Sequence, residues 1–190
     1  MTIEDEGTIR EYYDLRQKID TYNSDMRAVI THPNYCVSFL KPGRLIHIKY
    51  QDYDFGWSVV VNCQARKPPK NAPREEYEPR ESYIVDVLLP VSEDSFLKSK
   101  GVQPLPPGVK PANKGEPSKL EVVPVLLNCI HSISMVKIKM PSNLKPEESR
   151  KAVKKQIMQI QQRFPDGLAL LDPIENMNIT DDEFKRLLRV

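Results

Sequence analysis

The stretch from Lys41 to Cys63, KPGRLIHIKYQDYDFGWSVVVNC, has the pattern of a β-hairpin that is entered through a tight turn. Pro42-Gly43 is a turn pair, because proline presets φ and glycine supplies the positive φ of a type II turn. Residues 44–50 then alternate between polar and apolar side chains, which is typical of a strand. Residues 57–61 are β-branched and apolar enough for a buried strand. Such a hairpin needs further strands to be stable.

Three further strands are predicted downstream of the hairpin, over residues 82–89, 120–130 and 135–140. The resulting five strands are enough to close a small barrel. Pro124 lies inside the second of these runs and cannot donate to a ladder, so we expect an edge or a bulge at that point, and an interrupted edge is also where a peptide can dock. Gly56, inside the hairpin, is expected to take a backbone conformation that β-carbons disfavour.

Helical patterns flank the predicted barrel. The first runs from Thr8 to about Ile30 and is stopped by Pro33. The second covers residues 146–163, begins with a proline and two glutamates, and has one apolar face formed by Val153, Ile157, Ile160 and Phe164. A third begins at Thr180, where Thr180-Asp181-Asp182-Glu183 is a capping box.

The first helix carries an apolar seam with the 3-4 spacing of a coiled coil, formed by Tyr12, Leu15, Ile19, Tyr22, Met26 and Val29. The third helix is too short to be stable alone. We therefore expect the two helices to lie side by side and antiparallel, with the seam covered in part by Phe184, Leu187 and Leu188 and left exposed near Tyr12. Such a stalk would carry the barrel as an insertion in a larger protein.

Composition limits the class of protein. Hydrophobic residues make up 39% of the chain, no run approaches the roughly eighteen apolar residues of a membrane span, and the acidic N-terminus lacks a signal-peptide core, so we expect a soluble intracellular protein with no membrane partner. The three cysteines form no C-x-x-C pair, which argues against a disulfide framework and a zinc site. No cofactor or metal is predicted.

Charge is uneven although the net charge is only +2. Residues 1–25 hold seven acids and three bases, whereas residues 137–163 hold eight bases and two acids. Two proline-rich segments, 64–81 and 92–119, read as long surface loops, and the first begins with bases only. The basic segments fit either nucleic-acid binding or a solvated surface. The candidate RNA-binding side chains are Arg66, Lys67, Lys70, Arg74, Lys151, Lys154 and Lys155.

Enzyme patterns are weak in this sequence. The seven glycines never give the spacing G-x-x-x-x-G-K-[ST] of a phosphate-binding loop, so an ATPase site of this type is not encoded here. His32 and Cys36 flank a proline at a helix end, and His131-Ser132 has no acid placed to complete a triad, so we predict no catalytic residue. Asn178-Ile179-Thr180 is a formal glycosylation sequon, but Thr180 is better explained as a helix cap.

Several segments, in order, carry a family resemblance: YYDLRQKI, ITHPNYCVSFLKPGRL, DFGWSVVVN, SYIVDVLL, VVPVLL and QRFPDGLALLDPIENMNI. Together they resemble the arch domain of the nuclear exosome-associated DExH-box RNA helicases, the helicase subunits of TRAMP complexes. The resemblance spans nearly the whole chain and is poorest in the two long loops. It implies an α+β fold in which a KOW domain, an SH3-like β-barrel with added helices, sits on an antiparallel helical stalk.

The resemblance also implies a domain plan and a function. Residues 1–32 would be the first stalk helix, 33–145 the KOW barrel, 146–179 a helix and connector packed on it, and 180–190 the start of the returning stalk helix. The arch would be non-catalytic: it would recruit adaptor proteins with a Leu-Phe-x-hydrophobic-Asp motif and contact structured RNA. Through the full-length helicase it would serve the exosome in the nucleolus and nucleoplasm, in ribosomal RNA processing and nuclear decay.

For the peptide site, the resemblance implies that Arg44 pairs with the aspartate of the motif, which suits a guanidinium fixed by a turn. The apolar part of the motif needs a groove, and its candidates lie on apolar strands near Arg44 or near the proline-broken edge: Ile46, Val85, Val87, Val123 and Val125. Each of these also fits a plain core position. The alternative function is a basic RNA-binding barrel without peptide recognition.

Overall fold

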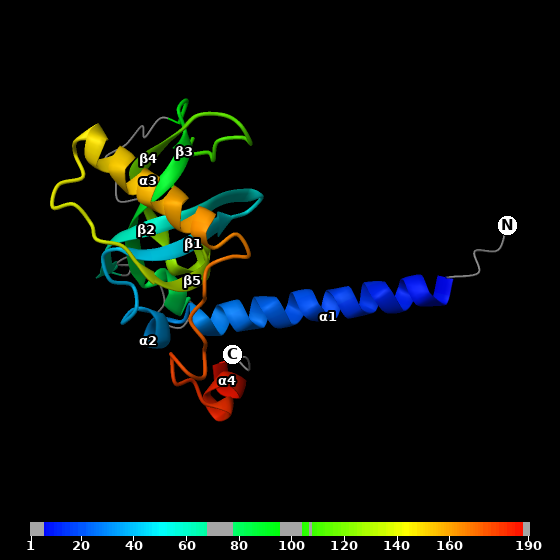
Figure 1. Cartoon of the computed structure of the whole chain (residues 1–190). Coiled ribbons are helices and arrows are strands. Elements are labelled where there is room, and N and C mark those ends of the chain that lie inside the picture. Colours follow the sequence, from blue (N-terminus) through cyan, green and yellow to red (C-terminus); the bar gives the residue numbers. More distant parts are fainter. Residues whose placement is uncertain (1–5, 68–77, 96–103, 107, 188–190) are drawn as a thin grey trace.

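A computed structural model describes residues 6–67, 78–95, 104–106 and 108–187 (Figure 1). The helices are α1 Glu6–Ile30, α2 Pro33–Cys36, α3 Glu147–Arg163 and α4 Asp181–Leu187, with short 3-10 turns η1 Pro79–Glu81 and η2 Leu127–Cys129. The strands are β1 Arg44–Tyr50, β2 Tyr53–Ala65, β3 Tyr83–Ser92, β4 Ser118–Leu126 and β5 Ile130–Lys137. The fold is therefore α+β, with α1 projecting from the strands as a long arm (Figure 1).

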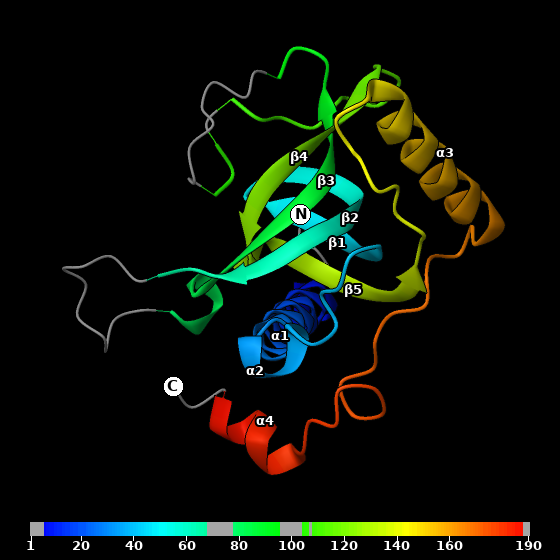
Figure 2. The same ribbon diagram turned by 90° about the vertical axis from the view of Figure 1, so that its left-hand side faces the viewer.

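The five strands form one antiparallel sheet in the order β4-β3-β2-β1-β5. β4 and β5 stand at opposite ends of this order, yet only the three residues of η2 connect them. Since so short a link cannot cross a flat sheet, the sheet must curl until its two ends meet (Figure 2). The predicted five-stranded barrel is confirmed.

Two sequence predictions about the strands need correction. The apolar run over residues 120–130 is not one strand, because β4 ends at Leu126 and η2 turns the chain before β5 begins at Ile130. The last strand accordingly covers 130–137 rather than 135–140. Both errors have the same cause: the turn residues Leu127 and Cys129 are buried, so apolar content does not fall where the chain changes direction.

The sheet is buried on both faces by two apolar layers. The interior cluster includes the fully buried side chains of Ile46, Ile48, Val60, Val85, Val87, Val123 and Val125. On the outer face, Val153 and Ile157 of α3 pack over a second cluster of Leu45, Val59, Leu88 and Leu120. Burying one such side chain stabilises the fold by about 1.5–3 kcal/mol. The predicted α3 face is correct except for Phe164, which is exposed beyond the last turn.

The predicted pairing of the first and last helices is largely wrong. α4 begins with the predicted cap, because the Thr180 hydroxyl accepts from the N–H of Glu183 at 3.3 Å and the Glu183 carboxylate accepts from the N–H of Thr180 at 3.0 Å. Phe184 packs against the interior cluster that includes Val29. The seam residues beyond Val29 are nevertheless exposed, with Tyr22 at 71%.

α4 lies at the foot of α1 instead of along it (Figure 1), with Glu183 of its first turn near Tyr35 of α2. The side chain of Leu187 and all of Leu188, the other predicted partners, lie outside the described residues. Within the part that the structure describes, no helix combines the length and apolar content needed to cross a bilayer.

We predict that Gly43→Ala destabilises the barrel more than Gly56→Ala. Both glycines have positive φ, +91° and +72°, so both alanines cost roughly 1–2 kcal/mol in backbone strain. A β-carbon at Gly43 would also lie 2.1 Å from the carbonyl oxygen of Ile138, whereas one at Gly56 would meet nothing within 4 Å. Urea unfolding should show an additional loss of about 1–3 kcal/mol for Gly43→Ala; equal losses for the two variants would contradict the close approach.

Candidate functional site

The turn at Gly43 fixes the position of Arg44 at one corner of the barrel. The N–H of Gly43 donates to the carbonyl of Val60 at 2.9 Å, and the N–H of Ile138 donates to the carbonyl of Gly43 at 2.9 Å. These bonds join the start of β1 to β2 and to the end of β5. In the resulting register Arg44 stands opposite Lys137.

Three backbone carbonyls hold the guanidinium of Arg44. Its Nε donates to Phe39 at 3.1 Å, and its Nη1 donates to Ser134 at 3.3 Å and to Met135 at 2.9 Å. Within the described residues Nη2 donates to no protein group, so the two N–H donors of this nitrogen stay available. Partial burial lowers the pKa of Arg44, but a guanidinium remains charged in proteins. Arg44 is thus a preoriented cation with two spare donors.

The surroundings of Arg44 combine charge with apolar surface. Lys137 is exposed beside it, Met135 is 51% exposed, and Phe39 is half-buried. A cationic pair next to apolar side chains suits a ligand that carries both a carboxylate and an apolar group. Sequence reasoning missed Lys137 as a site residue, because its position opposite Arg44 follows from pairing between strands far apart in the chain.

The five apolar groove candidates do not line a groove. Ile46, Val85, Val87, Val123 and Val125 each have 0% exposure and belong to the interior cluster. They alternate with residues that face outward, so strand geometry points all five into the barrel. Only Arg44 among the predicted peptide-binding residues reaches the surface, where it is half-buried.

The predicted RNA-binding bases fall into two separate groups. Arg66 is half-buried and Lys67 exposed just after β2, while Lys70 and Arg74 lie outside the described residues. The end of β2 and α3 stand on opposite sides of the barrel (Figure 2). On α3, Lys155 is exposed, Lys151 pairs with Glu147 at 2.8 Å, and the Lys154 ammonium donates to the carbonyl of Ser118. Lys154 therefore helps to hold α3 on β4.

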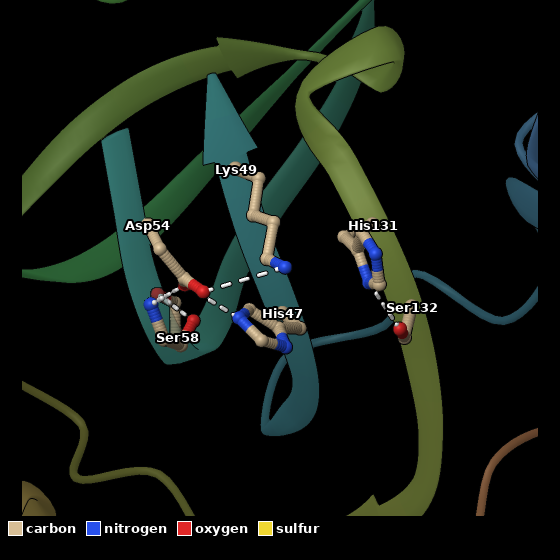
Figure 3. Close-up of polar contacts among 7 residues, drawn as sticks. His47, Lys49, Asp54, Ser58, His131 and Ser132 are labelled. Carbon is tan, nitrogen blue, oxygen red and sulfur yellow. Dashed lines mark hydrogen bonds and ion pairs between the residues drawn. The ribbon is translucent and has the colours of Figure 1, made fainter. Parts of the chain in front are cut away.

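A polar cluster lies on the outer surface of β1 and β2 (Figure 3). The imidazole Nε2 of His47 is 2.6 Å from Oδ1 of Asp54, Lys49 Nζ is 3.5 Å from Oδ2, and the N–H of Gly56 donates to Oδ1 at 2.9 Å. Partial burial raises the pKa of Asp54, but hydrogen bonds from His47 and Gly56 and the nearby positive charges outweigh it and lower the pKa overall. The cluster fixes the tip of the hairpin.

His131 stands beside this cluster without joining its carboxylate. Its Nδ1 is 2.8 Å from the Ser132 hydroxyl, and its ring centroid is 5.3 Å from that of His47 (Figure 3). Partial burial, followed by the positive charges of Lys49, His47 and Arg27, lowers the pKa of His131, whereas Asp54 acts in the opposite direction. Because Asp54 binds His47, a serine-histidine-acid chain is not assembled here.

The other candidate pair, His32 and Cys36, has a local structural role. The Nδ1 of His32 accepts from the N–H of Asn34 at 3.3 Å and caps α2. Burial raises the pKa of the Cys36 thiol to about 12, which leaves it protonated and unreactive. Across the described residues, no three side chains of histidine, cysteine, aspartate or glutamate gather in a geometry that holds a metal ion.

Two family models match the chain end to end: residues 32–190 match the Mtr4-like β-barrel domain, and residues 1–31 match the stalk of Mtr4-like exosome RNA helicases. The chain belongs to the Mtr4-like family. It is 40% identical over 99% of its length to the ATP-dependent RNA helicase mtr4 of Schizosaccharomyces pombe. It is 38% identical over its whole length to the exosome RNA helicase MTR4 of Homo sapiens. It spans only 17% of each of these relatives.

A plant helicase matches over nearly the same stretch. The DExH-box ATP-dependent RNA helicase DExH10 of Arabidopsis thaliana is 32% identical over 96% of this chain, which covers 18% of that protein. The predicted arch resemblance is confirmed at the level of the barrel and stalk of an exosome RNA helicase.

We predict that stability falls as pH falls because of His131. Its folded pKa lies below the usual 6.5, so the unfolded chain takes up a proton near pH 6.5 that the folded chain resists. The contribution of neutral His131 to the free energy of unfolding is fully present above pH 6.5 and is lost as pH falls toward the folded pKa of His131. In urea unfolding, the free energy of unfolding of His131→Gln should fall less between about pH 7 and pH 5 than that of the unchanged protein. An NMR titration midpoint of His131 at or above 6.5 would contradict this.

Proposed function

We propose that this chain is the non-catalytic arch of an exosome RNA helicase, which recruits adaptor proteins and contacts structured RNA. The ATP-driven engine would reside elsewhere in the full-length helicase, since this sequence lacks a phosphate-binding loop and spans about a sixth of its relatives. The adaptors would carry a Leu-Phe-x-hydrophobic-Asp motif. The setting would be the nucleus, in TRAMP-type and ribosomal RNA processing with the exosome.

The observation that carries the peptide part of this proposal is the Arg44 corner. A guanidinium held by three carbonyls keeps the donors of Nη2 free, and Lys137 adds a second positive charge opposite it. A carboxylate that binds the free Nη2 donors of Arg44 requires little reorganisation of the protein, which lowers the entropic cost of binding. Met135 and Phe39 supply adjacent apolar surface for the remainder of the motif.

The RNA part rests on charge. The segment from β5 through α3 carries most of the excess bases, and Lys155 and Lys151 stand exposed on α3. Because these bases are spread over a helix and are not interleaved with exposed aromatic rings on it, binding would be weak and independent of sequence.

The second candidate function is a basic RNA-binding barrel without peptide recognition. The observation that favours it is the structural use of Arg44: its three carbonyl bonds join the turn at Phe39 to β5 and would account for an arginine here without any ligand. A peptide titration separates the two functions, because only the first requires free donors on the guanidinium of Arg44 that bind a carboxylate.

We predict that Arg44→Glu and Lys137→Glu both weaken binding of a Leu-Phe-x-hydrophobic-Asp peptide. Losing the Arg44 partner of a partly desolvated ion pair should cost about 2–5 kcal/mol. Arg44→Glu should also lower the unfolding free energy, because it breaks the carbonyl bonds, so Lys137→Glu is the cleaner test. Lys139→Glu has the same charge change two residues away and serves as control. Calorimetry that finds unchanged affinity for both variants supports the second candidate function.

We predict that a structured RNA binds weakly and that salt weakens the complex steeply. Replacing Lys67, Lys151 and Lys155 with glutamine should reduce the slope of log K against log salt by about 0.7–0.9 for each lost phosphate contact. Lys154 is left intact because it binds the carbonyl of Ser118. A control replaces Lys18, Lys114 and Lys185, which lie exposed elsewhere. An unchanged slope in the first variant in fluorescence anisotropy would show that these bases do not contact RNA.

A further inference from the structure

The outer edge of β4 has backbone groups that face away from the sheet. β4 pairs with β3 in unbroken register from Ser118 to Leu126, so alternate residues point their N–H and C=O groups toward β3 or outward. Two contacts identify the outward set: the Pro124 carbonyl accepts from the N–H of Leu105 at 2.7 Å, and the Ser118 carbonyl accepts from Lys154. Leu120 and Val122 lie between Ser118 and Pro124 at alternate positions of the strand. Their backbone N–H and C=O groups therefore also point outward.

These two contacts use the outward carbonyls at both ends of the edge, at Ser118 and Pro124. The outward groups of Leu120 and Val122 lie between them. No backbone partner is recorded for Leu120 or Val122 on the outward side within the described residues. Leu120 is buried beneath α3, but Val122 is 38% exposed. An unpaired edge segment of this kind is a template for an added strand, which would supply the missing donors and acceptors.

An apolar cavity of about 570 Å³ opens beside Val122. Its apolar walls come from Pro42, Val61, Val122, Met140, Pro141 and Leu144. The volume is sufficient for a large apolar side chain, and Val122 of the exposed edge forms one wall of the cavity.

A second cavity of about 360 Å³ lies at the other end of the edge and is mostly charged. Lys119, Lys151 and Lys154 line it together with Glu93 and Glu147. Arg150 and Glu121, paired at 2.8 Å, line both cavities and so stand between them. Glu147 is paired with Lys151. The other charged side chains of this cavity, apart from the Arg150–Glu121 pair, are the positive Lys119 and Lys154 and the negative Glu93.

We propose that the outer edge of β4 between Ser118 and Pro124 binds an extended segment of a partner protein as an added strand. The segment places an apolar side chain in the Val122 cavity and a carboxylate by Lys119, across the Arg150–Glu121 pair. This goes beyond the proposed function, because it uses neither Arg44 nor Lys137. A single carboxylate suits the second cavity better than RNA does, since a polyanion would also meet three glutamates.

The test exploits Pro124, which shows that proline is accepted at an outward position of β4. Val122→Pro removes the outward N–H without removing a bond to β3, and Val122→Thr keeps the N–H with nearly the same shape. The probes are two short acetylated peptides, Thr-Leu-Thr-Val-Thr-Glu-Thr and its reverse, because an added strand can run in either direction. The readouts are NMR shifts and amide exchange on the full chain.

One of the peptides is expected to shift the Leu120 and Val122 resonances and to slow exchange of the Val122 N–H. Val122→Pro should weaken that peptide about tenfold, Val122→Thr less than about twofold, and Lys137→Glu not at all. Replacing the glutamate of the peptide with lysine should also weaken it. Equal binding to Val122→Pro and Val122→Thr, or no binding by either peptide, overturns the proposal. So does a structured RNA that shifts these resonances while neither peptide does.

Discussion

Two backbone hydrogen bonds at Gly43 hold three strands of this protein together. Its N–H reaches Val60 on β2 and its carbonyl receives the N–H of Ile138, just past the end of β5. The backbones approach so closely that a β-carbon would lie 2.1 Å from the Ile138 oxygen. Arg44 extends this junction with its bonds to the carbonyls of Phe39, Ser134 and Met135. The corner proposed to bind peptides is thus also a junction of β1, β2 and the end of β5.

This overlap links function to stability. The carbonyls that hold Arg44 keep its guanidinium from moving and leave the donors of Nη2 for a ligand. The orientation of the guanidinium is therefore set before binding. The cost is that Arg44 cannot be replaced without loosening the junction. Lys137 is exposed and, within the part of the chain that the structure describes, makes no hydrogen bond to these carbonyls, so it carries charge at the same corner with a smaller structural role.

The apolar layers on both faces of the sheet limit where partners can bind. The interior is closed by the core, and α3 covers much of the outer face. Among the described residues of the barrel, the surfaces that stay available include the Arg44 corner, the hairpin surface around His47 and Asp54, and the exposed part of the β4 edge near Val122. α1 leaves the barrel on another side from α3, so its nearly balanced charges lie apart from the basic α3 (Figure 1).

The sequence by itself determined the features that depend on local chemistry. The turn at Gly43, the alternation of β1, the cap at Thr180 and the amphipathic face of α3 follow from backbone preference and side-chain period, and each is present. Glycine at positive φ and a threonine cap act within a few residues, so short windows suffice to recognise them.

Only the tertiary structure decided which residues meet across the chain. Ile46, Val85 and the other groove candidates are core because the sheet curls around them, which an apolar strand pattern does not reveal. The division of β4 from β5 is hidden because the intervening turn is itself buried. The pairing of Lys137 with Arg44, the placement of α4 against Tyr35 and the outward groups of Val122 all depend on strand register and packing. These are long-range contacts, set by the closed sheet as a whole, and no local run of residues encodes them.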